Sequence, residues 1–145
     1  MKVMSLYGAI TIALFILTLA VSIHAMPTGH ELDRWKALSQ IETRDDDWAS
    51  GASGEISRYA ITPRVWKQYA GTVQSFAATN PFTAIQVGEA CMIDRCGKFE
   101  RKNHRRPTDA EWPMLWHAPA RLKTPTLADR DYTARFLNIL NRREK

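Results

Sequence analysis

The stretch ALSQIET, residues 37–43, completes a helical pattern in which apolar side chains fall on one face. Trp35 and Leu38 are three residues apart, and the pattern predicts an amphipathic helix from about residue 30 to residue 43. Glu42 follows Leu38 by four residues and therefore lies at the edge of the apolar stripe. The same position also suits a glutamate that reaches solvent or pairs with an arginine.

A carboxyl group at this place has two reasons to keep its proton. Partial burial disfavours the charged form, and so does the negative end of the helix dipole. We therefore expect the pKa of Glu42 to be raised. A glutamate with a raised pKa on a rigid helix meets the requirement for a general acid near neutral pH.

The chain that follows reads as further helices. Thr62 and Pro63 can start a short helix that ends near Gly71, and Asn80 with Pro81 can open a long one. Thr108 and Glu111 have the spacing of a capping box, and Pro113 should kink or shorten the helix that they begin. A last amphipathic helix places five apolar residues inward: Leu127, Tyr132, Phe136, Ile139 and Leu140.

These patterns predict a mainly α fold with one domain over residues 26–145. Residues 44–55 have loop composition, and a small irregular or β-ribbon segment is expected near residues 48–61. Five tryptophans supply anchors for the core, and we expect Trp35, Trp66 and Trp112 to pack there.

Residues 1–25 have the layout of a secretory signal peptide. Lys2 precedes a long uncharged apolar run, and Ala25 suits a cleavage site. The alternative is an uncleaved membrane anchor, because the apolar run is nearly long enough to span a bilayer. Either interpretation predicts an exported, periplasmic or extracellular protein, and after cleavage we expect no stable membrane association.

Cys91 and Cys96 are the only cysteines. Export permits a disulfide, but residues five apart on a continuous helix are too distant for one. Either the helix breaks near Gly97, or the two cysteines are buried thiols. The two thiols have no histidine partners at ligand spacing, so the sequence predicts no zinc site and no cofactor.

The chain has a formal net charge of +5, which suits an anionic envelope surface or polymer. The basic run KFERKNHRR at residues 98–106 is typical of a solvated helix end and loop. It could also steer the domain to a negatively charged wall. A nucleic-acid-binding helical domain is a third interpretation, and it conflicts with export.

Four pieces of the chain come in a telling order: SQIET at 39–43, GEISRYAITPRVW at 54–66, NP at 80–81 and LWHAP at 115–119. Together they resemble the goose-type lysozyme and soluble lytic transglycosylase family. In that family the catalytic glutamate ends a helix and is followed by Ser or Thr. A G-A-x-G-L-M-Q-I-x-P segment, an N-P pair that opens a long helix, and an A-Y-N-A-G motif come next. The resemblance spans roughly residues 32–137.

The resemblance implies a lysozyme-like enzyme that cleaves the β-1,4 bond between MurNAc and GlcNAc in peptidoglycan strands, with Glu42 as general acid and base. It implies substrate contacts from Tyr59, from Ile61 on the cleft floor, and from Trp116 and His117. Among the tryptophans, Trp48 in the polar loop is the one that we expect to stack on a sugar.

Two residues depart from the family pattern. Ala60 stands where the family has glutamine, and His117 stands where it has asparagine. A protonated His117 beside Glu42 would lower the pKa of that carboxyl group. The departures motivate a second hypothesis, namely a lysozyme-like domain that binds wall glycan or a protein partner without cutting.

The type of reaction depends on a second carboxylate. A hydrolase needs one, whereas a lytic transglycosylase uses the 6-hydroxyl group of the muramic acid itself. Glu55 is the better candidate, although its position suits an exposed loop acid, or one that accepts bonds from backbone amides, better than a catalytic role. Asp45, Asp46 and Asp47 are typical of a solvated loop. We expect transglycosylation rather than hydrolysis.

Overall fold

The computed structural model describes residues 29–143, so the predicted signal peptide lies outside the described residues. The fold is mainly helical, as predicted. Five α-helices and two short 3₁₀ helices follow one another: α2 (Gly29–Thr43), α3 (Pro63–Tyr69), η1 (Ser75–Thr79), α4 (Pro81–Asn103), α5 (Glu111–His117), η2 (Pro119–Arg121) and α6 (Leu127–Arg143). None of the helices within residues 29–143 is long and apolar enough to cross a membrane.

The helix starts follow the predicted capping chemistry. The Thr62 hydroxyl accepts a hydrogen bond from the Val65 amide at 3.3 Å, and α3 begins at the next residue with Pro63. Asn80 Oδ1 accepts bonds from the first amides of α4, with Phe82 N at 2.9 Å. These side chains satisfy amides that have no partner within the helix.

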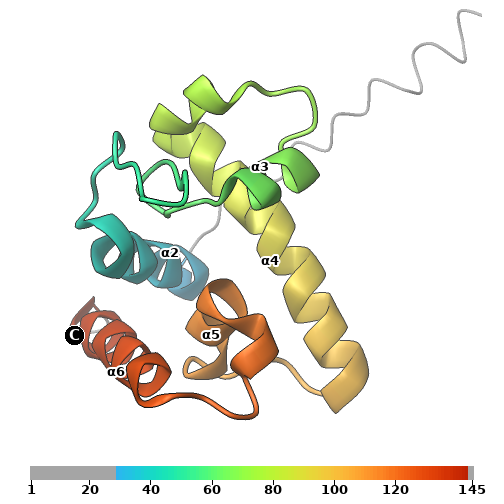
Figure 1. Ribbon diagram of the computed structural model, residues 1–145. Coiled ribbons are helices and arrows are strands. Elements are labelled where there is room, and N and C mark those ends of the chain that lie inside the picture. Colours follow the sequence, from blue (N-terminus) through green and yellow to red (C-terminus); the bar gives the residue numbers. More distant parts are fainter. Residues whose placement is uncertain (1–28, 144–145) are drawn as a thin grey trace, which may run out of the picture.

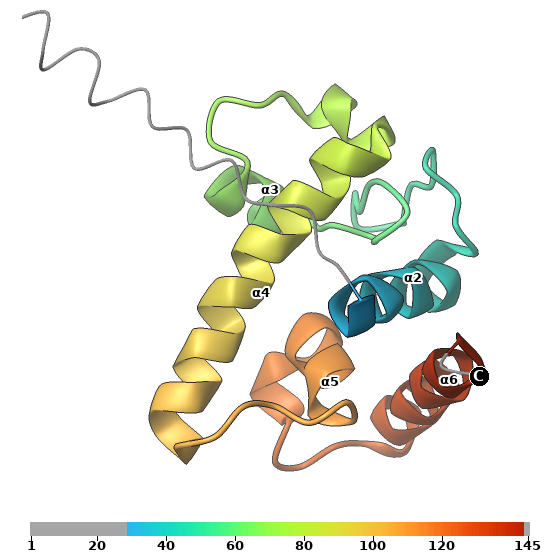
Figure 2. The same cartoon turned by 180° about the vertical axis from the view of Figure 1, so that it is seen from behind.

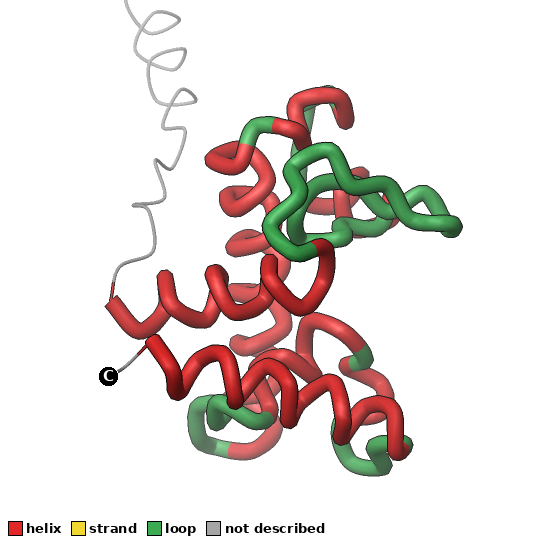
Figure 3. Tube along the Cα trace, turned by 90° about the vertical axis from the view of Figure 1, so that its left-hand side faces the viewer, coloured by secondary structure: helices red, strands yellow, loops and turns green. Residues whose placement is uncertain are grey.

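The long helix α4 packs against η1, α3 and α5. In Figures 1 and 2, α3 and η1 lie beside its first half and α5 lies beside its second half, with α2 between them. In Figure 3, α2 and α6 lie side by side and run in opposite directions. The irregular segment 44–62 passes over the end of α2 (Figure 3) and forms no named strand. Its only pairing is through two isolated antiparallel bridges, Ser50 with Ile56 and Ile56 with Ile61.

The core is built around Trp35, which is fully buried. Its indole ring meets Tyr59, Trp112 and Trp116 edge to face, with centroids 5.2, 5.3 and 5.6 Å away. Gly88 of α4 makes this arrangement possible, because a Cβ there would lie 2.7 Å from Trp35 Cη2. The predicted burial of Trp35, Trp66 and Trp112 is confirmed.

Cys91 and Cys96 both lie on the continuous helix α4 as free thiols, which agrees with the spacing argument.

The prediction that Leu127 faces inward is wrong, because its side chain is 84% exposed. Leu127 precedes Tyr132 by five residues and so lies about 140° around the helix from the buried stripe. In the first turn of α6 the buried side chain is that of Asp129 instead.

Candidate functional site

Glu42 lies in the last turn of α2 and faces Tyr132 of α6. The Tyr132 hydroxyl donates a hydrogen bond to Glu42 Oε1 at 2.5 Å. Burial raises the pKa of Glu42, and the nearby carboxylate of Glu55 raises it further. The bond from Tyr132 and the charge of Arg135 oppose this rise, but burial prevails. The expectation of a raised pKa is confirmed, with burial as the main cause.

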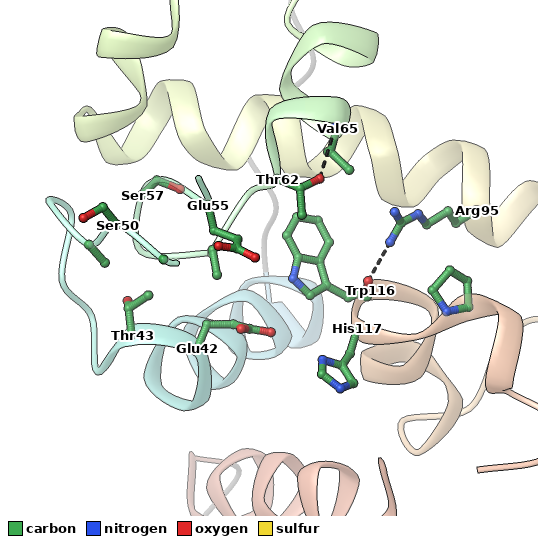
Figure 4. A pocket seen from close by; sticks show the side chains of 14 residues that line it. Glu42, Thr43, Ser50, Glu55, Ser57, Thr62, Val65, Arg95, Trp116 and His117 are labelled. Atoms are coloured by element: carbon green, nitrogen blue, oxygen red, sulfur yellow. Dashed lines mark hydrogen bonds between the residues drawn. The ribbon is translucent and has the colours of Figure 1, made fainter. Parts of the chain in front are cut away.

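An open cavity of about 610 Å³ lies in front of Glu42. Its walls come from the end of α2, from the irregular segment and from the end of α5 (Figure 4). The residues that line it are Glu42, Thr43, Ala49, Ser50, Gly51, Glu55, Ser57, Ala60, Thr62, Val65, Arg95, Trp116, His117 and Pro119. A cavity of this size and openness can admit a small ligand or part of a polymer.

The irregular segment is held over α2 by polar contacts. Thr43 Oγ1 donates to the Arg58 carbonyl at 2.9 Å. Arg58 in turn donates two hydrogen bonds to the carboxylate of Asp47, at 2.5 and 2.8 Å. Ser39 Oγ also donates to Asp45 Oδ1. Asp45 and Asp46 are exposed, as the prediction of a solvated loop implied, and the contacts of Asp45 and Asp47 also hold the irregular segment in place.

Glu55 lies on the wall opposite Glu42, and Figure 4 shows both side chains pointing toward the same space. Glu55 Oε2 also accepts a hydrogen bond from the Ser53 amide at 3.0 Å. Gly51 provides the room for this carboxylate, because a Cβ there would lie 2.2 Å from Glu55 Oε2. Glu55 thus combines two expected positions, a lining carboxylate and an acceptor for a loop amide.

Trp116 lines the cavity from the end of α5, as the resemblance implied. Arg95 of α4 donates to the carbonyl groups of Leu115 and Trp116, both at 2.7 Å. Figure 4 shows the bond to Trp116. Carbonyl groups in the last turn of a helix lack partners within the helix, and the guanidinium group satisfies two of them. Arg95 also lies over the Trp116 ring, 5.9 Å from its centroid, and so fixes the indole at the cavity.

His117 also lines the cavity, and its ring stacks on Tyr132 with centroids 4.2 Å apart. Burial lowers the pKa of His117, although the Asp129 carboxylate, 3.6 Å away, opposes this change. His117 is therefore neutral at neutral pH and leaves the raised pKa of Glu42 in place. The His117 ring packs against Tyr132, whose hydroxyl group contacts Glu42.

Three residues expected at the substrate lie elsewhere. Trp48 is 80% exposed and does not line the cavity. Tyr59 and Ile61 are buried in the core, and their neighbours Ala60 and Thr62 line the cavity instead. The tight turn at residues 57–60 causes this exchange, because Ser57 and Ala60 both have a positive φ, of 69° and 48°.

Sequence reasoning missed Tyr132 and Arg95 as site residues. Tyr132 was assigned to the core only, although a buried tyrosine hydroxyl needs a hydrogen-bond partner, which is the signal that could have identified it. Arg95 lies within the long helix α4, and its two carbonyl partners on α5 are visible only in three dimensions.

Within residues 29–143, no group of three or more His, Cys, Asp or Glu side chains could hold a metal ion. Comparison of the chain with protein-family models, with curated proteins and with solved structures found no match.

Proposed function

We propose that this chain is an exported peptidoglycan-cleaving enzyme that uses Glu42 as its general acid and base. One observation carries the proposal: a carboxyl group with a raised pKa, held by Tyr132, lies on an open cavity of about 610 Å³. The oxygen of a glycosidic bond is a poor leaving group until it is protonated, and a glutamic acid in such a place can protonate it. The sequence resemblance to lytic transglycosylases supplies the substrate class.

Lytic transglycosylation is the favoured reaction, because one carboxyl group suffices for it. Glu42 gives its proton to the bridging oxygen, and the C1–O bond breaks. The 6-hydroxyl group of the same muramic acid then attacks C1 and returns a proton to Glu42. The product carries a 1,6-anhydro ring, and the catalyst is regenerated.

Hydrolysis would need Glu55 to activate water or to form a covalent intermediate. Its place opposite Glu42 keeps this route open (Figure 4). Mass spectrometry of the digestion products separates the two reactions. A 1,6-anhydro end supports the proposal, and a reducing end indicates hydrolysis.

The second candidate function is glycan binding without cleavage. It is favoured by Ala60, whose methyl side chain lines the cavity where the family has an amide that could hold substrate. Sedimentation of the protein with peptidoglycan, without release of soluble muropeptides, would support this candidate against the enzyme.

The decisive test is clearing of a peptidoglycan suspension by the chain without residues 1–25. We expect the wild type to clear it and Glu42→Gln to fail. Glu100→Gln is the matched control, because Glu100 lies near the far end of α4 and lines a different cavity. Equal clearing by the wild type and Glu42→Gln would remove Glu42 from the mechanism.

A further inference from the structure

A second cavity, of about 570 Å³, opens on the other side of Glu42. It lies between the end of α2 and the outer part of α6, the two helices that run side by side in Figure 3. Its lining comprises Gln40, Ile41, Glu42, Thr43, Arg44, Arg135, Asn138, Ile139 and Arg142. Glu42 and Thr43 line both cavities, so the two spaces meet at the proposed catalytic acid.

The second cavity is strongly basic. Three of its lining residues are arginines, and Glu42 is the only acidic residue among the described residues that line it. Arg135 pairs with Asp131 at 3.1 Å in an exposed position. Within residues 29–143, no carboxylate lies within 4.0 Å of the guanidinium group of Arg44 or Arg142. Both groups can therefore bind an external anion.

The backbone also points to a role for Arg44. It ends α2 in the left-handed conformation, with φ of 59°. Glycine is the usual residue there, and a side chain at such a position carries a conformational cost. Arg44 adopts this conformation despite the cost, and its guanidinium group lines the cavity. A glycine at this position would supply no charge.

We propose that this basic cavity binds a carboxylate of the peptide attached to the muramic acid whose bond Glu42 cleaves. The inference rests on the proposed function, because it takes the glycan strand to occupy the first cavity. The peptide branches from the sugar ring, so a space that adjoins the catalytic acid can receive it. Arginine suits this partner, because its planar guanidinium group matches a carboxylate with paired hydrogen bonds.

Isothermal titration of the purified protein tests this assignment. The probe is N-acetylmuramic acid that carries its dipeptide with free carboxylates, which has no glycosidic bond to cleave. We expect the double variant Arg44→Gln/Arg142→Gln to bind it at least about fivefold more weakly than the wild type, as two exposed charge contacts allow. The same probe with amidated carboxylates should bind the wild type as weakly as the charged probe binds the variant.

The matched control is Lys102→Gln/Lys123→Gln, which removes two charges from a basic cavity that shares no lining residue with the cavity of Arg44 and Arg142. It should leave the affinity unchanged, and an equal loss would mean that bulk charge attracts the probe and would overturn the proposal. Unchanged affinity in the arginine variant would also overturn it. All four side chains are exposed, so thermal unfolding should confirm that both variants fold.

Inorganic phosphate is the second probe, because phosphate offers arginine the same chemistry. If phosphate displaces the muramyl peptide at equal concentration, the cavity is a general anion site and the assignment to the peptide fails. Cleavage of peptidoglycan is measured separately. Arginine-dependent binding without any cleavage would refute the enzyme and support this site, whereas cleavage with arginine-independent binding would refute this site alone.

Discussion

Tyr132 and Glu42 are 90 residues apart in the sequence and share a hydrogen bond of 2.5 Å. The bond has two opposing effects on the carboxyl group. It fixes the orientation of Glu42, and it stabilises the ionised form, which lowers the pKa against the larger effect of burial.

Tyr132→Phe should therefore raise the pKa of Glu42 further. The alkaline limb of the pH–activity profile should move to higher pH, because Glu42 then keeps its proton longer. Loss of the hydrogen bond that orients Glu42 should lower the maximal rate about tenfold. Muropeptide release measured across pH tests the limb, and a carbon-13 titration of Glu42 tests the pKa without relying on activity.

Tyr69→Phe is the control for this change. The Tyr69 hydroxyl donates to Asp94 at 2.7 Å, on residues that do not line the first cavity. Its removal should leave the profile in place. A Tyr132→Phe profile that moves to lower pH would contradict the role given to the hydroxyl.

Glu42→Gln should stabilise the fold at neutral pH while it abolishes cleavage. The folded-state pKa of Glu42 is raised above its ordinary value of 4.5, so ionisation costs stability as the pH rises above that value. The glutamine keeps a carbonyl acceptor for Tyr132 and carries no charge. Urea unfolding at pH 7 should show a higher midpoint for the variant, with the difference lost at pH 4. A variant that is less stable at both pH values would contradict the burial argument.

Glu55→Gln should preserve cleavage within about tenfold if the reaction is transglycosylation, because a single carboxyl group carries that chemistry. It should also lower the pKa of Glu42 slightly, since a neighbouring negative charge is removed. Product analysis should still find 1,6-anhydro ends. A loss of about a hundredfold or more, from a wild type that forms reducing ends, would make Glu55 the second carboxylate of a hydrolase.

Gly88→Ala should destabilise the protein by about 1–2 kcal/mol, because overpacking outweighs the better helix propensity of alanine. The added Cβ would lie 2.7 Å from Trp35 Cη2, and the fully buried indole ring cannot move aside. Gly97→Ala on the same helix is the control. Its Cβ would meet only the end of the Arg101 side chain, at 3.4 Å, so stability should stay equal or rise. Urea unfolding of both variants checks the pair, and equal stabilities would refute the close packing.

Asp129→Asn should destabilise the fold at pH 7, because the neutral amide loses the charge-assisted hydrogen bonds of the carboxylate. Asp129 is buried and accepts bonds from Arg121 at 2.7 and 2.8 Å and from the Thr126 amide at 2.9 Å. The bonds from Arg121 are the main reason that the pKa of Asp129 lies well below its usual range. The stabilisation is therefore fully present above the unfolded pKa of about 3.9 and is lost as the pH falls further.

Thermal unfolding of Asp129→Asn at pH 7 and pH 2 measures this difference. Asp131→Asn is the control, because its carboxylate is 69% exposed and its pair with Arg135 should contribute less than about 0.5 kcal/mol. A constant difference between wild type and Asp129→Asn across this pH range would contradict the ionised pairing.

The helices could be predicted from sequence because their signals are local. The Thr62–Pro63 and Asn80–Pro81 starts and the periodic stripe around Trp35 each depend on residues within a few turns of one another. The raised pKa of Glu42 could be predicted for the same reason, since its place on the stripe already implied burial.

The cavity walls could not be predicted in this way. Which residues of the 57–62 segment face the cavity depends on a turn with positive φ at Ala60 and on the distant pair between Arg58 and Asp47. The partner of Glu42 lies on the last described helix, and no local pattern connects the two. Trp48 is a second example. The composition of its loop suggested a side chain that stacks on a sugar, but it did not determine where the side chain of Trp48 points.

The bond between the first and last described helices also makes the geometry of Glu42 depend on the complete fold. Glu42 can be positioned only after α6 has packed against α2 with its tyrosine in place. An incompletely folded chain therefore has the acid but not the geometry that directs it. A wall-cutting activity built in this way would switch on only when folding is complete.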